Sequence, residues 1–229
     1  MLVAVAKAYL KHGNEKAAWG SLGMIYFIVR LFSLALSKYF WCRFEGKENL
    51  PAKGPFILAA NHSSYLDPLL LGASTNHFLH FIVRDKLLNF PVVGWVLKRC
   101  CTIPIKRHGN NIGAIKDAVR VLKKGNVLAM FPEGTRTKDR KLKRAKSGVG
   151  MIVSMAKAPV VPVYIKGTFD ALPRRLRTLK RLPVQIHIGK PIDFSKKHDQ
   201  KRGQELYQAI SDEIMQHIAA LKEKADKAP

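Results

Sequence analysis

From Phe44 to the end of the chain, short β-rich runs alternate with segments of helical periodicity. A chain of this pattern folds as a sheet covered by helices, because every apolar strand and helix stripe must be buried against another element. The predicted strands are residues 56–60, 79–83, 102–105, 127–131, 160–165 and 184–188. We therefore expect an α/β fold with a mixed, mostly parallel sheet, formed by one domain over residues 43–229.

Three helices are predicted between and after these strands. Apolar residues at steps of three and four run over residues 112–122, and Gly125 follows as a stop signal. Residues 147–157 form the second predicted helix, and residues 201–224 the third. The length of 229 residues suits a single domain with a short appendage.

The appendage is an apolar amino-terminal region, residues 1–42. Its stretch 19–41 is nearly long enough to span a bilayer, but Arg30 in the middle would cost about 2.5–3.5 kcal/mol on insertion. The polar residues of this stretch recur at helical steps and form one stripe: Gly23, Tyr26, Arg30, Ser33 and Ser37. With a second amphipathic pattern over residues 2–11, this predicts a pair of helices anchored in the membrane interface. A buried helix of the core and a single membrane span are the alternatives.

The charge of the chain indicates its partners. Lys and Arg number 40 against 16 Asp and Glu, a net charge of +24, and basic residues cluster at 138–146 and 174–181. Such an excess suits phosphates, an anionic membrane surface, an acidic protein or nucleic acid. Nucleic acid is disfavoured, because no recognition motif is present and the aromatic residues lie in apolar runs. We expect a positive face toward anionic lipid, worth about 1 kcal/mol per basic residue near the surface.

The cysteines indicate a reducing compartment. Cys42, Cys100 and Cys101 are odd in number and have no CxxC spacing. A disulfide scaffold and a cysteine-based zinc site are therefore both disfavoured.

Residues 56–68, FILAANHSSYLDP, carry the first candidate site. His62 follows an apolar strand, and Asp67 lies five residues later. Histidine titrates near neutrality and is the usual general base, and a carboxylate on its other ring nitrogen would fix its tautomer. The stretch offers no evident nucleophile of its own, which fits a reaction in which a substrate hydroxyl attacks. The alternative is structural: Asp67 and Pro68 also form a common helix start.

Residues 131–137, FPEGTRT, carry the second candidate site, directly after the predicted strand 127–131. Gly134 and the small Thr135 permit close backbone approach, and Arg136 can form a bidentate pair with a phosphate. Glu133 could orient that arginine or bind a substrate hydroxyl. The alternative is a tight turn with solvent-facing charges.

Four blocks in order resemble the glycerolipid acyltransferases of the 1-acylglycerol-3-phosphate acyltransferase type. They are Asn61–Asp67 with its NHxxxxD pattern, residues 101–107 (CTIPIKR), the FPEGTR at 131–136, and VVPV at 160–163. Together they span about a hundred central residues. The second block departs from the family pattern, because it lacks the usual glycine and phenylalanine.

This resemblance implies transfer of a fatty acyl group to the free hydroxyl of 1-acylglycerol-3-phosphate, giving phosphatidic acid in phospholipid biosynthesis. The donor would be a thioester of coenzyme A or of acyl carrier protein, with no metal and no bound cofactor. By similarity, His62 would be the general base and Asp67 its orienting partner, while Pro162 would be structural. The residues implied to bind substrate are Asn61, Lys106, Arg107, Glu133, Gly134, Thr135 and Arg136.

The resemblance also implies a place and partners. The enzyme would sit on the cytoplasmic face of the inner membrane as a peripheral or monotopic protein, against the anionic leaflet. Its partners would be membrane lipids, lysophosphatidic acid and the acyl donor. Alternative acceptors are glycerol-3-phosphate, a lysophospholipid with a headgroup, or an ornithine lipid. A catalytically silent membrane scaffold is a further alternative, against which the intact Asn61, His62, Asp67 and Glu133 argue.

Overall fold

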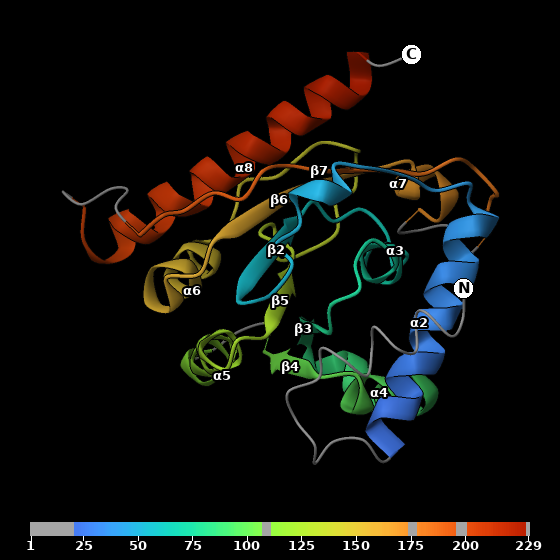
Figure 1. Cartoon of the computed structure of the whole chain (residues 1–229), viewed down its shortest axis with the longest axis horizontal. Helices are drawn as coiled ribbons and strands as arrows, with labels where there is room; N and C mark the ends of the chain where they lie inside the picture. Colours follow the sequence, from blue (N-terminus) through green and yellow to red (C-terminus); the bar gives the residue numbers. More distant parts are fainter. Residues whose placement is uncertain (1–20, 107–110, 174–177, 196–200, 228–229) are drawn as a thin grey trace.

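A computed structural model describes residues 21–106, 111–173, 178–195 and 201–227, and it shows an α/β protein built on one sheet (Figure 1). The sheet has seven strands in the order β1-β7-β6-β2-β5-β3-β4. Every neighbouring pair is parallel except β6 and β7. The strands are β1 (Arg43–Glu45), β2 (Phe56–Ala60), β3 (Leu79–Arg84), β4 (Thr102–Ile105), β5 (Val127–Met130), β6 (Val160–Lys166) and β7 (Gln185–Ile188). The expected mixed, mostly parallel sheet is confirmed.

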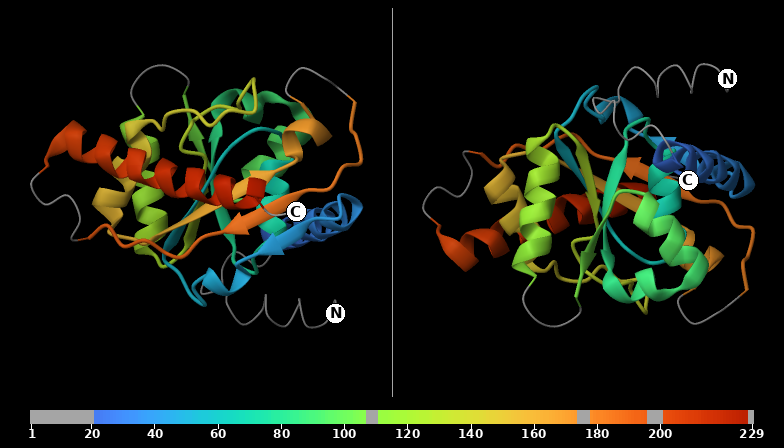
Figure 2. Two further views of the ribbon diagram at one scale, coloured as in Figure 1. Left: turned by 90° about the horizontal axis from the view of Figure 1, so that it is seen from above. Right: turned by 90° about the horizontal axis from the view of Figure 1, so that it is seen from below.

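Helices cover both faces of this sheet. Figures 1 and 2 show α5, α6 and α8 on one face and α2, α3 and α4 on the other. The helices are α2 (Ser21–Tyr39), α3 (Asp67–Ala73), α4 (Pro91–Arg99), α5 (Ile112–Lys123), α6 (Ser147–Ala156), α7 (Thr168–Ala171) and α8 (Gly203–Lys227), with 3-10 turns η1 (Lys47–Asn49) and η2 (Asp85–Asn89).

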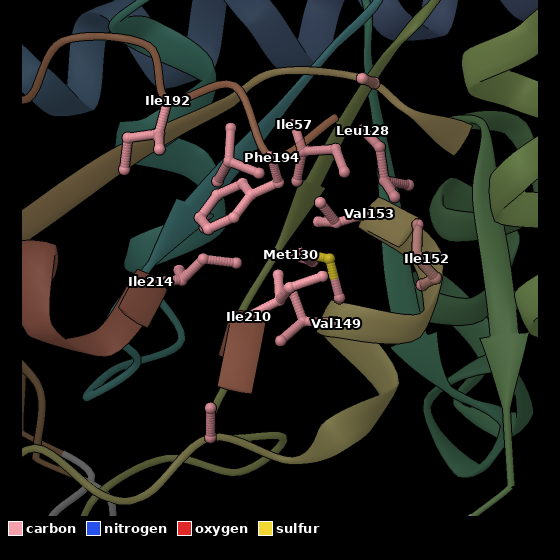
Figure 3. Close-up of a cluster of buried hydrophobic side chains, with 14 of the residues drawn as sticks. Ile57, Leu128, Met130, Val149, Ile152, Val153, Ile192, Phe194, Ile210 and Ile214 are labelled. Carbon is pink, nitrogen blue, oxygen red and sulfur yellow. The ribbon is translucent and has the colours of Figure 1, made fainter. Parts of the chain in front are cut away.

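Two hydrophobic cores lie on the two faces of the central strand β2. Ile57 and Ala59 belong to the core under α5, α6 and α8, which Figure 3 shows around Met130 and Ile214. Phe56, Leu58 and Ala60 belong to the opposite core, with α3. All five residues of β2 are fully buried, as expected for a parallel strand covered on both faces. The strand is therefore a rigid support for whatever follows it.

The parallel register brings the two candidate motifs together. Ala59 of β2 pairs with Met130 of β5, so both strands end at the same level of the same edge. The chain after β2 continues into Asn61, and the chain after β5 continues into Phe131. In open α/β sheets, ligands bind at the carboxyl ends of the strands.

The predicted amino-terminal helix is present as α2, and its polar stripe faces inward, against α3 and the segment that follows it. The Arg30 guanidinium donates to the carbonyl oxygen of Thr75 and, over 2.6 Å, to Oδ1 of Asn76. The Tyr26 hydroxyl donates to the carbonyl oxygen of His77 and accepts the N–H of Leu79. The inner side of α2, which carries the polar stripe, is buried as the core-helix alternative predicts. The outer side of α2 is more exposed than a core helix would be.

The outer face of α2 is apolar. Met24, Ile28 and Phe32 are exposed at steps of four residues. Among the described residues, no helix is both long and apolar enough to cross a bilayer. The second predicted helix of the pair, residues 2–11, lies outside the described residues.

Candidate active site

The first motif forms a His–Asp pair at the carboxyl end of β2. Nδ1 of His62 lies 2.8 Å from Oδ2 of Asp67. Asp67 is fully buried, and the same Oδ2 also accepts the backbone N–H groups of Ser63 and Ser64. These two donors hold the carboxylate in place, so that Asp67 in turn fixes the orientation of the imidazole. Nε2 is the ring nitrogen left to accept a proton.

The helix start predicted at Asp67 and Pro68 is present, but the cap residue is Leu66 and not Asp67. Helix α3 begins at Asp67 with Pro68 in its first turn, but no side chain caps it. The carboxylate instead turns back to the loop that carries His62. The imidazole is also held from one side by Phe131, whose ring stacks on it at 4.0 Å between centroids. The His62 imidazole is therefore held by residues of both motifs.

Glu133 joins the two motif loops through main-chain atoms. Its Oε1 accepts the backbone N–H of His62 at 2.9 Å, and its Oε2 accepts the backbone N–H of Lys143 at 3.2 Å. The N–H of Thr137 donates to the carbonyl oxygen of His62 at 2.8 Å, which closes the same junction. Glu133 is buried, so it acts in these contacts as a clamp between the loops.

Burial also changes the acidity of this clamp. Desolvation raises the pKa of the Glu133 carboxyl to about 7, against the lowering effect of the His62 and Lys143 backbone donors and of the Lys143 charge. In the unfolded chain a glutamate titrates near its ordinary value of about 4.3. Between these two values the folded protein holds one more proton than the unfolded chain.

This difference predicts how stability changes with pH. The free energy of unfolding falls wherever the folded state binds more protons, so Glu133 should destabilise the fold progressively as pH rises from about 4.3 to about 7. Urea unfolding of wild type and Glu133→Gln over this range checks the prediction. The wild type should lose up to about 3 kcal/mol relative to the variant, whose amide does not titrate. Parallel pH profiles for the two proteins would contradict it.

The second motif presents Arg136 beside the His–Asp loop. The Arg136 guanidinium lies 3.5 Å from the ring centroid of Tyr65, an exposed residue between His62 and Asp67. A cation over an aromatic face at this distance is held in position. Tyr65 is a candidate functional residue that sequence reasoning missed; its only signal is a lone aromatic inside the first motif.

Neighbouring cations brace the turn that carries Arg136. Nζ of Lys143 donates to the carbonyl oxygen of Arg136 at 3.0 Å, and Nη2 of Arg84 donates to that of Gly134 at 3.2 Å. Gly134 has a positive φ of 66°, and a Cβ there would come within 3.0 Å of the Lys146 side chain. The positive φ is the reason that glycine suits this turn, since the flexible Lys146 side chain can move away from a Cβ.

The remaining predicted site residues have different surroundings. The buried Asn61 amide binds both backbone groups of Ile165, accepting its N–H at 2.7 Å and donating to its carbonyl at 3.0 Å. This geometry makes Asn61 a brace between β2 and β6, and its contact with substrate stays a prediction. Lys106 is exposed directly after β4, and Thr135 is half-buried in the second loop. Arg107 lies outside the described residues.

The fold and this site define an α/β protein with a His–Asp pair and a cationic loop at one edge of its sheet. The chain belongs to the acyltransferase family, whose sequence profile matches residues 42–166. It is 31% identical over 186 residues to the 1-acyl-sn-glycerol-3-phosphate acyltransferase of Bacillus subtilis, covering 79% of this chain and 88% of that protein.

Plant proteins and a solved structure are also similar. The chain is 32% identical to the chloroplastic 1-acyl-sn-glycerol-3-phosphate acyltransferase BAT2 of Brassica napus over 75% of its length, and it spans 51% of that protein. It spans 49% of the chloroplastic relative LPAT1 of Arabidopsis thaliana, also at 32% identity. The crystal structure of the LPA acyltransferase PlsC from Thermotoga maritima matches with a TM-score of 0.74 at 22% identity, over 99% of this chain and 90% of that one. The last similarity supports the fold alone.

Proposed function

We propose that this protein transfers a fatty acyl group from an acyl thioester to the free hydroxyl of 1-acylglycerol-3-phosphate, giving phosphatidic acid. The observation that carries the proposal is the His62–Asp67 pair lying beside the Arg136 loop at one edge of the sheet. The pair supplies a base for a hydroxyl, and the loop supplies a cation for a phosphate. The names of the relatives support this choice of acceptor.

The chemistry follows from the two ring nitrogens of His62. Nε2 takes the proton of the acceptor hydroxyl while its oxygen attacks the thioester carbonyl carbon. The tetrahedral intermediate collapses with cleavage of the carbon–sulfur bond, and the thiolate leaves with the proton from the imidazolium. Asp67, hydrogen-bonded to Nδ1, stabilises the imidazolium between the two steps. A positioned base of this kind contributes about 10²–10⁴-fold to the rate.

Arg136 is proposed to bind the acceptor phosphate, with Lys106 and Arg107 as further candidates. A guanidinium pairs with phosphate through two parallel hydrogen bonds. Tyr65 beneath Arg136 would act as a positioning residue, since it holds the guanidinium without touching the reacting atoms. The acyl donor is proposed to be a thioester of coenzyme A or of acyl carrier protein, with no metal or bound cofactor in the mechanism.

This role predicts a selective binding defect. Arg136→Ala should raise the KM for 1-acylglycerol-3-phosphate by about 10-fold or more, because the variant loses a charge-assisted hydrogen bond to the phosphate. The KM for the acyl donor should change little. Tyr65→Leu should raise the KM for 1-acylglycerol-3-phosphate to a smaller extent, and Tyr65→Phe, which keeps the aromatic face, should restore it. Steady-state kinetics with each substrate varied in turn distinguish the two constants. Equal changes in both KM values would count against a phosphate role.

The proposed function is tested by thiol release from palmitoyl-coenzyme A with and without 1-acylglycerol-3-phosphate. Release that depends on this acceptor, with phosphatidic acid as product, supports the proposal. Glycerol-3-phosphate, lysophosphatidylcholine and a lyso-ornithine lipid, supplied in its place, test the alternative acceptors. An assay with palmitoyl-acyl carrier protein tests the second donor. Absence of acceptor-dependent release with both donors would overturn the function.

The site of action is proposed to be the cytoplasmic face of the inner membrane. The apolar outer face of α2 and the net charge of +24 support association with an anionic leaflet. In this arrangement the lysolipid comes from the membrane and the thioester from solution.

A further inference from the structure

A second apolar surface lies outside α2 and the catalytic residues, on the segment from the end of η2 through α4. Val92 is 76% exposed, and Phe90 and Trp95 are 57% and 50% exposed. Val93, beside them, is also exposed. Four large apolar side chains open to solvent within six residues form a concentrated patch, which on soluble proteins marks an interaction site.

This patch is next to the exposed face of α2. Helices α2 and α4 contact each other and cover the same face of the sheet (Figures 1 and 2). The exposed residues of α2, Met24, Ile28 and Phe32, therefore have a neighbouring apolar surface from a distant part of the sequence.

The charges around the patch point to the kind of partner. Lys86 and Lys98 are exposed on either side of it, and the guanidinium of Arg99 lies 4.3 Å from the ring of Trp95. The sequence has no Asp or Glu between Lys86 and Lys116, and none in α2. Asp85, at the start of η2, is the acidic residue next to this stretch, and it is outnumbered by Lys86, Lys98 and Arg99. Apolar and aromatic side chains with an excess of cations beside them are the pattern of a surface that enters the interface of an anionic membrane.

We propose that the η2–α4 surface, comprising Phe90, Val92, Val93 and Trp95, inserts into the interface of an anionic lipid bilayer. The inference rests on the proposed function in one respect, namely that the acceptor is a membrane lipid. The position of α4 in the fold links this membrane contact to the candidate active site. Strand β3 leads into η2 at the edge of the sheet that carries the site, and its last residue, Arg84, donates to the carbonyl oxygen of Gly134. Insertion of α4 therefore brings the Arg136 loop to the lipid surface.

Tryptophan fluorescence tests this contact directly. The chain has three tryptophans, Trp19, Trp41 and Trp95, so Trp19→Phe with Trp41→Phe leaves Trp95 as the single reporter. With vesicles of phosphatidylcholine and phosphatidylglycerol, Trp95 emission should shift to shorter wavelength. Brominated acyl chains should then quench it by about half or more, since the quencher reaches only inserted residues.

A matched pair of variants provides the second measurement. Val92→Asp should weaken binding to the same vesicles by about tenfold or more, because the carboxylate removes apolar burial and repels anionic lipid. Met155→Asp is the control, since Met155 is an exposed apolar residue of α6 on the opposite face of the sheet, and it should bind as wild type does.

Three results would overturn the inference. If the protein binds vesicles but Trp95 is not quenched, then a surface other than the η2–α4 surface contacts the membrane. Emission that is already at short wavelength without vesicles, and insensitive to brominated lipid, shows that a second copy or another segment of the chain covers the patch. Equal loss of binding in the α4 and Met155 variants shows a general effect of charge. None of these measurements requires turnover, so an inactive protein with quenched Trp95 would refute the proposed function alone.

Discussion

Acceptor-dependent thiol release should fall by about 10²–10⁴-fold when His62 is replaced by alanine, the loss expected on removal of a positioned general base. The physical reason lies in the geometry of the ring. Asp67 on Nδ1 and Phe131 against its face hold the imidazole in one orientation, and alanine has no group that can take a proton at that position. The measurement is single-turnover and steady-state release of coenzyme A, with the KM of both substrates expected to change little.

His217→Ala is the matched control, because His217 is an exposed histidine of α8 that pairs with Glu213 one turn away and lies far from His62 in the sequence. It should retain wild-type release. Release that persists in the His62 variant at the wild-type rate would refute the proposed mechanism, while leaving the family assignment untouched.

Asp67→Asn should lower kcat by about 10³-fold while the protein remains folded. The backbone N–H groups of Ser63 and Ser64 require an acceptor at the position of Oδ2, so the asparagine should place its oxygen there. Its NH₂ group then takes the place of Oδ1, which makes no hydrogen bond in the described structure. The contact with Nδ1 of His62 is kept and only the negative charge is lost. An ion pair about 4 Å apart at an effective dielectric constant of about 20 is worth about 4 kcal/mol, which corresponds to that decrease in rate.

Two comparisons make this result specific. Asp212→Asn removes a surface carboxylate that pairs with Arg144, and it should leave kcat unchanged. Thermal unfolding should show that Asp67→Asn is folded at the assay temperature, with a Tm below that of wild type because its buried NH₂ group has no acceptor. A fully active Asp67→Asn enzyme would show that the carboxylate has only a structural role.

Much of the fold follows from local sequence signals. The strands over residues 56–60 and 102–105 are confirmed with the expected bounds. For residues 56–60 the signal is an apolar run between Pro55 and Asn61. The helix predicted to stop before Gly125 ends at Lys123. Gly125, two residues later, adopts a positive φ of 81°. Strand β1 could not be predicted, since three residues carry no periodicity, and their pairing with β7 is decided by tertiary contacts.

The sequence predicted where the candidate site lies better than it predicted the contacts that its residues make. Asp67 was recognisable as the partner of His62 by spacing. The partners of Glu133 were not, because backbone N–H groups are present at every position and leave no compositional signal. Tyr65 was missed for a similar reason, since its stacking on Arg136 joins residues far apart in the chain.

The sequence also could not predict whether the polar stripe of α2 faces the protein or its surroundings. A polar stripe on an apolar helix fits water, lipid headgroups or buried carbonyl groups equally well. The carbonyl groups of Gly72 and Thr75 and the amide of Asn76 decide the matter for Arg30. These acceptors come from the end of α3 and the segment after it, whose position relative to α2 only the folded chain defines.

The contacts of Glu133 separate the residues that hold His62 in place from neighbouring residues that can be exchanged. Glu133, Thr137 and Asn61 hold the loops through main-chain atoms of His62, Lys143 and Ile165. The side chain of the half-buried Thr135 takes part in none of these main-chain contacts, so this residue can be exchanged while His62 keeps its place. Variation limited to Thr135 would therefore change the surroundings of the proposed acceptor site, while Phe131 and Glu133 continue to hold His62.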